Sequence, residues 1–261
     1  MKHTWKAGLV VVALAACAGA AKADVTLSGP TGLFLNPTAQ VAQKSADVAV
    51  EYQRLSQGGN SANLYGIVGA IQLANKLELN GGFRRVSLDG VHANDYNGGL
   101  KYQVLNQSEK GFALAVGADY GRTTLNIPSF VDLTFTSYDA YVAGTKDFNS
   151  GSGRAPIQGT LGLRWNHLKV DFGGLGSISD SKVDVFAGVA VPLSKTGEFS
   201  LIGELGSKRL EGGSSPYSIG VRYHPKASSF NVGAGYARGN TGGILGDSKG
   251  LFVQAGYQFG K

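Results

Sequence analysis

The chain has 261 residues, of which 40 are glycine and 16% are charged, and its formal net charge is +6. Glycine is about twice as frequent as the usual 7%, and charged residues, usually about 25%, are scarce. Residues 1–23 hold three lysines and no acid, which leaves 21 basic and 18 acidic side chains, a charge of +3, in the remainder. This balance is too small to indicate a nucleic-acid partner.

The first 23 residues have the pattern of an export signal. A basic start precedes an apolar run over 7–16, and small residues surround a cleavage site after Ala23. The run is shorter than the roughly 20 residues that a membrane-spanning helix needs, and no later segment approaches that length. The sequence therefore predicts an exported protein with a signal peptide at 1–23 and no helical membrane span.

The single cysteine, Cys17, allows a second interpretation of this region. Leu14-Ala15-Ala16-Cys17 looks like a lipoprotein box, in which the cysteine would be lipidated and become the mature N-terminus. Cleavage after Ala23 is favoured, because a small-x-small site lies at a normal distance from the apolar run. In either case the mature chain has no disulfide, so sheet hydrogen bonds and packing must hold the fold.

The segment 24–45 differs from the rest of the chain. Gly29-Pro30 and Asn36-Pro37 are turn signals, and they bracket a short apolar patch at Leu33-Phe34-Leu35. The segment does not share the alternating pattern that begins at residue 46.

From residue 46 onward, apolar and polar residues alternate nearly everywhere in long runs separated by turn-forming clusters. Soluble strands average about 5 to 6 residues, whereas a tilted strand that crosses a bilayer needs about 9 to 11. The pattern predicts an all-β fold, an antiparallel up-and-down transmembrane β-barrel over 46–261 with about 12 strands, and it leaves ten or fourteen open. The predicted strands are 46–55, 63–73, 77–88, 95–105, 111–121, 133–146, 157–168, 182–192, 197–208, 215–224, 229–237 and 250–259.

The connections between these runs alternate in length. Odd-numbered runs are followed by long polar or glycine-rich links such as "SQGGNSA", "DGVHAN" and "RTTLNIPSFVD", and even-numbered runs mostly by tight links such as "ANK" and "HPKAS". The link "DFNSGSGRAP" after the sixth run disagrees. Long external loops and short periplasmic turns are typical of outer-membrane barrels, in which an even strand count returns both ends to the periplasm.

Apolar and small residues occupy opposite faces of the better-formed runs. Over 183–191 the odd positions are valine or alanine, and the even positions are Asp184, Phe186, Gly188 and Ala190. A soluble sheet would carry long polar side chains on its water face, whereas small residues with isolated charges suit the interior of a narrow barrel. Phe112 and Tyr120 would lie about 20 Å apart along the membrane normal, near the spacing of two aromatic girdles. We therefore predict that the apolar face meets lipid, with a soluble sandwich as the less favoured alternative.

Two runs fit the alternation less well. Tyr138 and Val142 continue the apolar face of the sixth run, but Leu133 and Phe135 fall on its opposite face. We therefore predict a β-bulge near Ser137. The second run, "NLYGIVGAI", is apolar on both sides.

The inward face of the predicted barrel carries charges of both signs. Such groups must pair or stay hydrated, so they either form a salt-bridge network that stiffens the barrel or line a polar pore. No ring of one sign is present, so no marked ion selectivity is predicted. These lumen-lining candidates are Glu51, Glu78, Arg84, Lys101, Asp119, Arg164, Asp184, Glu204 and Arg222.

Catalytic and metal-binding patterns are scarce. His167 and His224 are followed by Leu168 and Pro225, so neither begins the His-x-Ser arrangement of outer-membrane lipases and deacylases. No acid cluster of the kind used by outer-membrane aspartyl-type proteases is evident, and the histidines lack metal-ligand spacing. The sequence therefore predicts no catalytic residue, no metal site and no cofactor.

The start of the mature chain resembles an exopolysaccharide-associated outer-membrane β-barrel family, which opens with a G-x-T-G-L motif and a Pro-x-Ala. The matching residues are Gly29, Thr31, Gly32, Leu33, Pro37 and Ala39. A wider resemblance, to porin-like Gram-negative outer-membrane β-barrels, covers nearly the whole chain. Many of those proteins end on phenylalanine, whereas Gly260-Lys261 follows Phe259 here.

These observations predict a barrel in the cell outer membrane that forms a passive, porin-like channel for small solutes. The residues 24–45 would be either a periplasmic lead or a plug in the lumen. The expected partners are outer-membrane lipid, the barrel-assembly machinery, and small solutes or polysaccharide-assembly proteins. A non-conducting accessory barrel in exopolysaccharide or cell-envelope assembly is the alternative function, and a membrane-embedded hydrolase is the least favoured.

Overall fold

A computed structural model describes most of the chain after the expected signal peptide. The described residues are 25–30, 32–42, 46–57, 60–88, 91–107, 111–126, 133–148, 155–207, 214–225, 228–240 and 247–260. The predicted signal peptide at 1–23 and Cys17 lie outside them. In the described part of the chain, no helix has the length and apolar character needed to cross a membrane.

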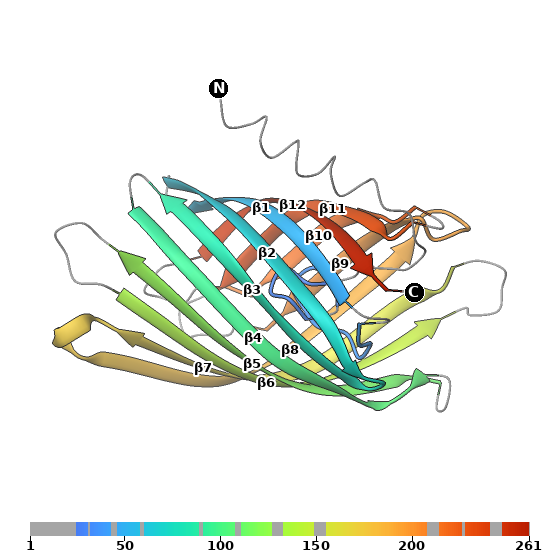
Figure 1. Cartoon of the computed structure of the whole chain (residues 1–261), viewed down its shortest axis with the longest axis horizontal. Helices are drawn as coiled ribbons and strands as arrows, with labels where there is room; N and C mark the ends of the chain where they lie inside the picture. Colours follow the sequence, from blue (N-terminus) through green and yellow to red (C-terminus); the bar gives the residue numbers. More distant parts are fainter. Residues whose placement is uncertain are drawn as a thin grey trace, which may run out of the picture.

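Twelve antiparallel strands form one closed barrel (Figure 1). Each strand pairs with its neighbours in the chain, and the ring closes where β1 pairs with β12, from Ala46 opposite Phe259 to Ser56 opposite Lys249. The predicted all-β antiparallel barrel of about 12 strands is confirmed. The strands are β1 Ala46–Gln57, β2 Asn60–Ala74, β3 Leu77–Leu88, β4 Val91–Leu105, β5 Ala113–Asn126, β6 Leu133–Phe148, β7 Ile157–Asp171, β8 Ser177–Pro192, β9 Phe199–Gly206, β10 Tyr217–Tyr223, β11 Phe230–Asn240 and β12 Asp247–Phe259.

The two ends of the barrel differ. We call the end where β1 meets β2, β3 meets β4 and β7 meets β8 the loop end, and the opposite end the turn end. A single 3-10 turn, Gly173–Leu175, joins β7 to β8 at the loop end. It lies at the left of Figure 1, and the turn end lies at the right.

Several strands reach further toward the loop end than the sequence predicts. Only 58–59 separate β1 from β2 and only 89–90 separate β3 from β4, so the long links expected from "SQGGNSA" and "DGVHAN" are wrong. Gly-Gly and Asp-Gly are favoured in two-residue hairpins, and the polar residues around them belong to the strands.

The predicted β-bulge near Ser137 is also wrong. Ser137 pairs with Gly121 of β5 and Leu168 of β7, and both ladders run through this position without a register shift. Leu133 and Phe135 therefore do point to the inner face. The register shifts that do occur lie near the turn end, between Gln72 and Ala74 of β2 and between Gln103 and Leu105 of β4.

The outer surface of the barrel wall is apolar. On β10, Ile219 is 52% exposed and faces outward with Tyr217, Val221 and Tyr223, whereas Arg222 is 7% exposed and faces inward. Aromatic side chains form an outward row near each end. The loop-end aromatic row contains the ring pairs Tyr52–Tyr65, Phe83–Tyr96 and Tyr120–Tyr138 together with Trp165, Tyr217 and Tyr236. The turn-end row contains Phe199–Tyr223 and Phe259, whose ring packs against the largely buried Tyr257.

Candidate functional site: a lumen occupied by the N-terminal segment

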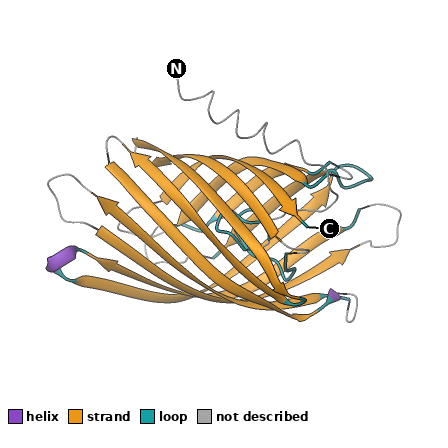
Figure 2. Cartoon of the chain, in the orientation of Figure 1, coloured by secondary structure: helices purple, strands orange, loops and turns teal. Residues whose placement is uncertain are grey.

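The segment before the first strand lies inside the barrel. We call its described residues, 25–30 and 32–42, the plug; Figure 2 shows this segment as loop within the ring of strands. Phe34 and Ala39 are fully buried, and Leu33 is nearly so. The sequence leaves a periplasmic lead or a lumen plug open for 24–45, and the described residues of this segment bond to inward side chains of the wall.

A tight turn forms the centre of the plug. Gly32 and Pro37 form an isolated antiparallel bridge, and the Leu33 N–H donates to the Asn36 carbonyl at 3.1 Å. A Cβ at Gly32 would meet the Asn36 carbonyl and Pro37, so the turn requires glycine there. Its proline and asparagine favour turn formation, as the sequence indicates.

One wall carboxylate binds this turn through its backbone. Glu204 of β9 accepts N–H groups from Phe34, Leu35 and Asn36, the last at 2.8 Å. The hydroxyl of Ser218 on β10 donates to the same carboxylate. Three successive N–H groups that converge on an anion compensate a buried charge without a cation, as in a backbone nest.

Arg222 of β10 binds the other side of the turn. Its guanidinium donates to the carbonyl oxygens of Leu33 at 3.0 Å and Gly32 at 3.4 Å, and it lies 4.8 Å from the centroid of the Phe34 ring. Glu204 and Arg222 therefore bind the donors and the acceptors of the same turn. The cation–π contact of Arg222 with Phe34 strengthens this binding because it is shielded from water.

The Phe34 ring fits between the Phe252 side chain and two glycines of the barrel wall. It packs edge-on against Phe252 of β12, with centroids 4.7 Å apart. A Cβ added at Gly220 or at Gly233 would lie 2.8 or 2.7 Å from ring atoms of Phe34. Glycine on β10 and β11 therefore makes room for the plug.

Arg164 of β7 and two further wall residues bind the rest of the turn and the stretch after it. Arg164 donates to the side-chain oxygen of Asn36 at 2.9 Å, and its guanidinium lies 4.9 Å from the Phe186 ring centroid. Thr145 accepts the N–H of Ala39 at 2.8 Å, and Gln103 donates to the Ala39 carbonyl at 2.9 Å.

A buried ion pair binds the end of the plug. Glu78 of β3 accepts the Ala42 N–H at 2.7 Å, and its carboxylate lies 3.3 Å from the Lys101 ammonium of β4. Both charged side chains are fully buried. Because breaking such a pair leaves an uncompensated charge, each partner depends on the other.

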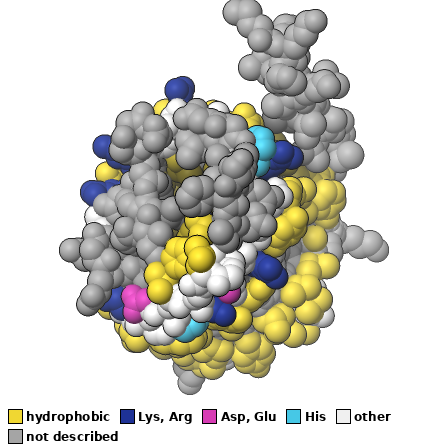
Figure 3. Space-filling view, turned by 90° about the vertical axis from the view of Figure 1, so that its left-hand side faces the viewer, with side chains coloured by type: hydrophobic (Ala, Val, Ile, Leu, Met, Phe, Trp, Pro, Cys, Tyr) yellow, Lys and Arg dark blue, Asp and Glu magenta, His cyan; other side chains and the backbone are white. Residues whose placement is uncertain are grey.

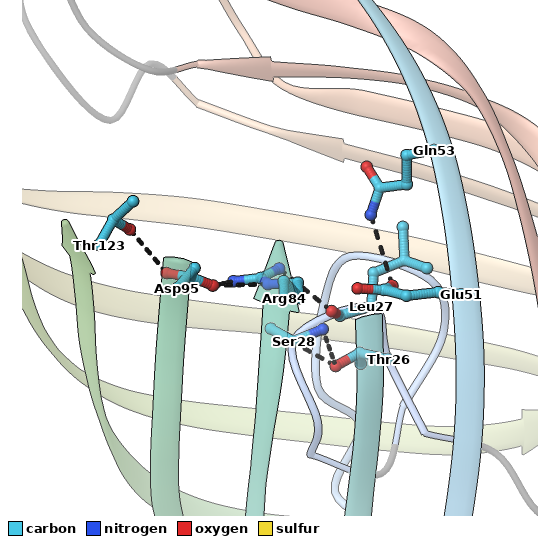
Figure 4. Close-up of polar contacts among 8 residues, drawn as sticks. All are labelled: Thr26, Leu27, Ser28, Glu51, Gln53, Arg84, Asp95 and Thr123. Atoms are coloured by element: carbon cyan, nitrogen blue, oxygen red, sulfur yellow. Dashed lines mark hydrogen bonds and ion pairs between the residues drawn. The ribbon is translucent and has the colours of Figure 1, made fainter. Parts of the chain in front are cut away.

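A second polar network holds the start of the plug (Figure 4). Arg84 donates to the Leu27 carbonyl at 3.2 Å and to Asp95, whose other oxygen accepts the Thr123 hydroxyl at 2.6 Å. Beside it, Glu51 accepts a hydrogen bond from Gln53 on the same strand. Three strands thus support one contact with the plug backbone.

The nine charged candidates all lie on the inner face, but most of them do not border open space. Glu78, Arg84, Arg164, Glu204 and Arg222 bond directly to the plug, and Lys101 supports Glu78. Asp184 accepts a hydrogen bond from Asn166, and Asp119 packs over Gly99. Strand parity therefore places five of the nine candidates where they bond to the plug, although the sequence does not identify that partner.

Several inward acids were missed, among them Asp47, Asp95 and Asp139. Asp47 and Asp95 lie on the same strand faces as the candidates Glu51 and Lys101, and Asp139 pairs with the candidate Asp119. Strict alternation from Glu51 or Lys101 would have found the other two. Among the described residues, no group of three or more His, Cys, Asp or Glu is placed to hold a metal ion.

Among the described residues, Gln40 and Val41 of the plug border two cavities at the turn end. The first, about 570 Å³, is lined mainly by side-chain amides, including Gln72, Gln103 and Asn106. The second, about 390 Å³, reaches Arg222. The plug therefore has free volume beside it on the turn-end side.

Comparison with known proteins supports the fold. No protein-family model matches the sequence, and no curated protein matches it either. Among solved structures, the NanC porin is similar with 11% identity and a TM-score of 0.51, over 82% of this chain and 100% of that one. The KdgM porin is similar with 12% identity and a TM-score of 0.50, over 81% and 99%, and is also known in complex with disordered oligogalacturonate. The chain thus has the fold of outer-membrane β-barrel porins, whereas the resemblance to the exopolysaccharide-associated family stays a prediction.

Proposed function

We propose that the protein is an outer-membrane channel of the porin kind whose lumen is closed by its own N-terminal segment. Small solutes would pass when the plug leaves the lumen. The observation that carries the proposal is that Glu204 and Arg222 both form hydrogen bonds with the backbone of the turn 32–37. The porin fold and the apolar outer wall between two aromatic rows support the membrane location.

The chemistry of the plug contacts suits a reversible closure. The wall binds mostly backbone N–H and C=O groups, which water can satisfy equally well once the plug is released. The charges that hold the plug would then face water and line the pore. Because Asp47, Asp95 and Asp139 add to the acidic side chains of the lumen, we expect a modest cation preference in the open state.

Single-channel recording in planar bilayers tests this proposal. We expect small or rare openings from the wild type, and larger stable steps from a variant lacking 25–42 and from the double variant E204Q/R222Q. The matched control is E198Q/R54Q, because Glu198 lies in a turn-end link and Arg54 faces outward. Wild-type steps as large as those of the deletion variant would show a passive pore and refute the closure.

An accessory barrel is the second candidate, and one observation favours it. Gly32, Leu33, Pro37 and Ala39 match the motif of the exopolysaccharide-associated family, and they form or flank the turn that Glu204 and Arg222 hold. In such a barrel the plug would be a permanent part of the fold. Silence from a plug-deleted protein that still migrates as a folded band in unheated SDS would favour this role.

A further inference from the structure

On the described strands, six basic side chains face outward at the loop end. Arg54, Arg85 and Arg122 each lie two residues beyond an aromatic residue of the loop-end row on the same strand. Residues i and i+2 share a face and are about 6.6 Å apart, so these bases lie one step beyond the aromatic row. The basic ring consists of Arg54, Arg85, Arg122, Lys169, Arg238 and Lys249. Figure 3 looks onto this end, and its dark-blue side chains lie around the periphery of the barrel.

The polarity of the wall reverses at the level of the basic ring. Beyond the aromatic row the outward positions are polar, as at Asn63, Asn94 and Thr136, and inward positions are apolar, as at the buried Ala93 and Val170. Between the two aromatic rows the arrangement is the opposite. A wall that is apolar outside only up to the aromatic row meets hydrocarbon only up to that row, so the basic ring lies at the level of lipid headgroups.

Outward charge is concentrated at this one rim. Asp171, 4.0 Å from Lys169, is an outward acid at the loop end, and Asp247 of β12 has the same strand parity as Lys249, so the six bases outnumber the acids there. The turn end has one outward strand base, Lys146. On the described strands, outward bases are therefore more numerous at the loop-end rim than at the turn end.

The bases are also placed close to one another. Arg238 and Lys249 lie directly opposite in the β11–β12 ladder, and Arg122 and Lys169 both pair with Thr136 from its two sides. Like charges directly opposite in a sheet are destabilising, and the two bases that flank one strand are about 9.6 Å apart. An anion between them would relieve this repulsion. Phosphate fits, since arginine binds its oxygens in a bidentate way.

We propose that the basic ring binds the phosphate groups of lipid headgroups in the leaflet at the loop end. This inference rests on the proposed membrane location, but not on conduction. Several bases around one rim bind a lipid that carries more than one phosphate better than a lipid with a single charge. The basic ring is therefore a binding site for phosphorylated lipids around the outside of the barrel.

The test uses the full folded protein in zwitterionic detergent. Trp165 reports from the aromatic row, where it stacks on His167 with ring centroids 6.0 Å apart. Its emission is followed during titration with diphosphorylated lipid A, with the same glycolipid lacking its phosphates, and with inorganic phosphate. We expect saturable binding of lipid A alone.

Two triple variants with equal charge loss locate the site. R85Q/R122Q/K169Q removes half of the basic ring, and K76Q/K146Q/K195Q removes three lysines from the turn end. We expect the first to weaken lipid A binding at least tenfold and the second to leave it within twofold. Equal weakening by both, or equal wild-type binding of the dephosphorylated glycolipid, would overturn the proposal.

Insertion is measured separately, as the heat-modifiable shift of protein folded into neutral vesicles. A wild type that does not insert would refute both the membrane location and the basic ring. A wild type that inserts but binds lipid A no better than R85Q/R122Q/K169Q would refute the basic ring alone. Displacement of lipid A by millimolar inorganic phosphate would show a free-anion site and would also refute the lipid assignment.

Discussion

Glu204 accepts the backbone N–H of Asn36 at 2.8 Å, across 168 positions of sequence. The same carboxylate accepts the two preceding N–H groups, so one wall residue satisfies the donors of a whole turn. The inside of this barrel therefore binds a peptide backbone much as a helix cap does.

Removing the Glu204 carboxylate should release the turn of the plug while the pairing of the barrel strands stays intact. In E204A three backbone N–H groups lose their acceptor, and each buried unsatisfied donor costs about 1–3 kcal/mol. We expect the amides of 34–36 to exchange with deuterium at least tenfold faster, while those of β9 and β10 keep their rates. E198A, in the turn-end link, should change neither; unchanged exchange at 34–36 in E204A would contradict the assigned role.

The shape of Arg222 should matter as well as its charge. Lysine keeps the charge, but it cannot reach two carbonyl oxygens with a planar fork or stack on the Phe34 ring in the same way. We expect R222K to increase the frequency of channel openings in planar bilayers, to a smaller extent than deletion of 25–42. R54K makes the same exchange on the outer face, and a similar effect there would show that the Arg222 contacts are not responsible.

The strand pattern could be predicted from the sequence because lipid outside and crowding inside impose opposite preferences on alternate residues. On β10 the exposed Ile219 and Val221 alternate with the buried Ser218, Gly220 and Arg222. Beyond the aromatic row this rule reverses, since water replaces lipid outside. That reversal explains why strand ends rich in serine and asparagine were assigned to loops, and why Phe135 suggested a bulge that is absent.

The plug contacts could not be predicted in the same way. Glu204, Arg222 and Glu78 bind backbone groups of the plug, and every sequence offers such groups. Inward charges were visible from strand parity, but their partners were not, because no side-chain complementarity marks them. The signal that was available is the apolar patch at 33–35 between two proline-containing turns, which is unusual for an exposed periplasmic lead.

The buried pair of Glu78 and Lys101 should show strong coupling. K101M leaves the Glu78 carboxylate buried without its ammonium, a change that typically costs about 3–5 kcal/mol. In K101M/E78Q the amide oxygen at position 78 still accepts the Ala42 N–H, and no unpaired charge is buried. The decrease in the free energy of unfolding should therefore be smaller than in K101M alone. Urea unfolding in detergent measures both, with K146M on the outer face as control; additive losses would contradict the coupling.

The fit of Phe34 against glycine gives the most direct test of closure. In G233A the new Cβ would lie 2.7 Å from Phe34, and because that ring is enclosed by Phe252 and Arg222, the plug must shift. Overpacking of this kind costs about 1–3 kcal/mol, and here the cost falls on plug docking and leaves strand pairing intact. We expect larger and more frequent channel openings with an unchanged unfolding midpoint of the barrel. G144A is the matched control, because the nearest atom to its Cβ is 3.7 Å away. Equal conductance of G233A, G144A and the wild type would show that the position of Phe34 does not control the pore.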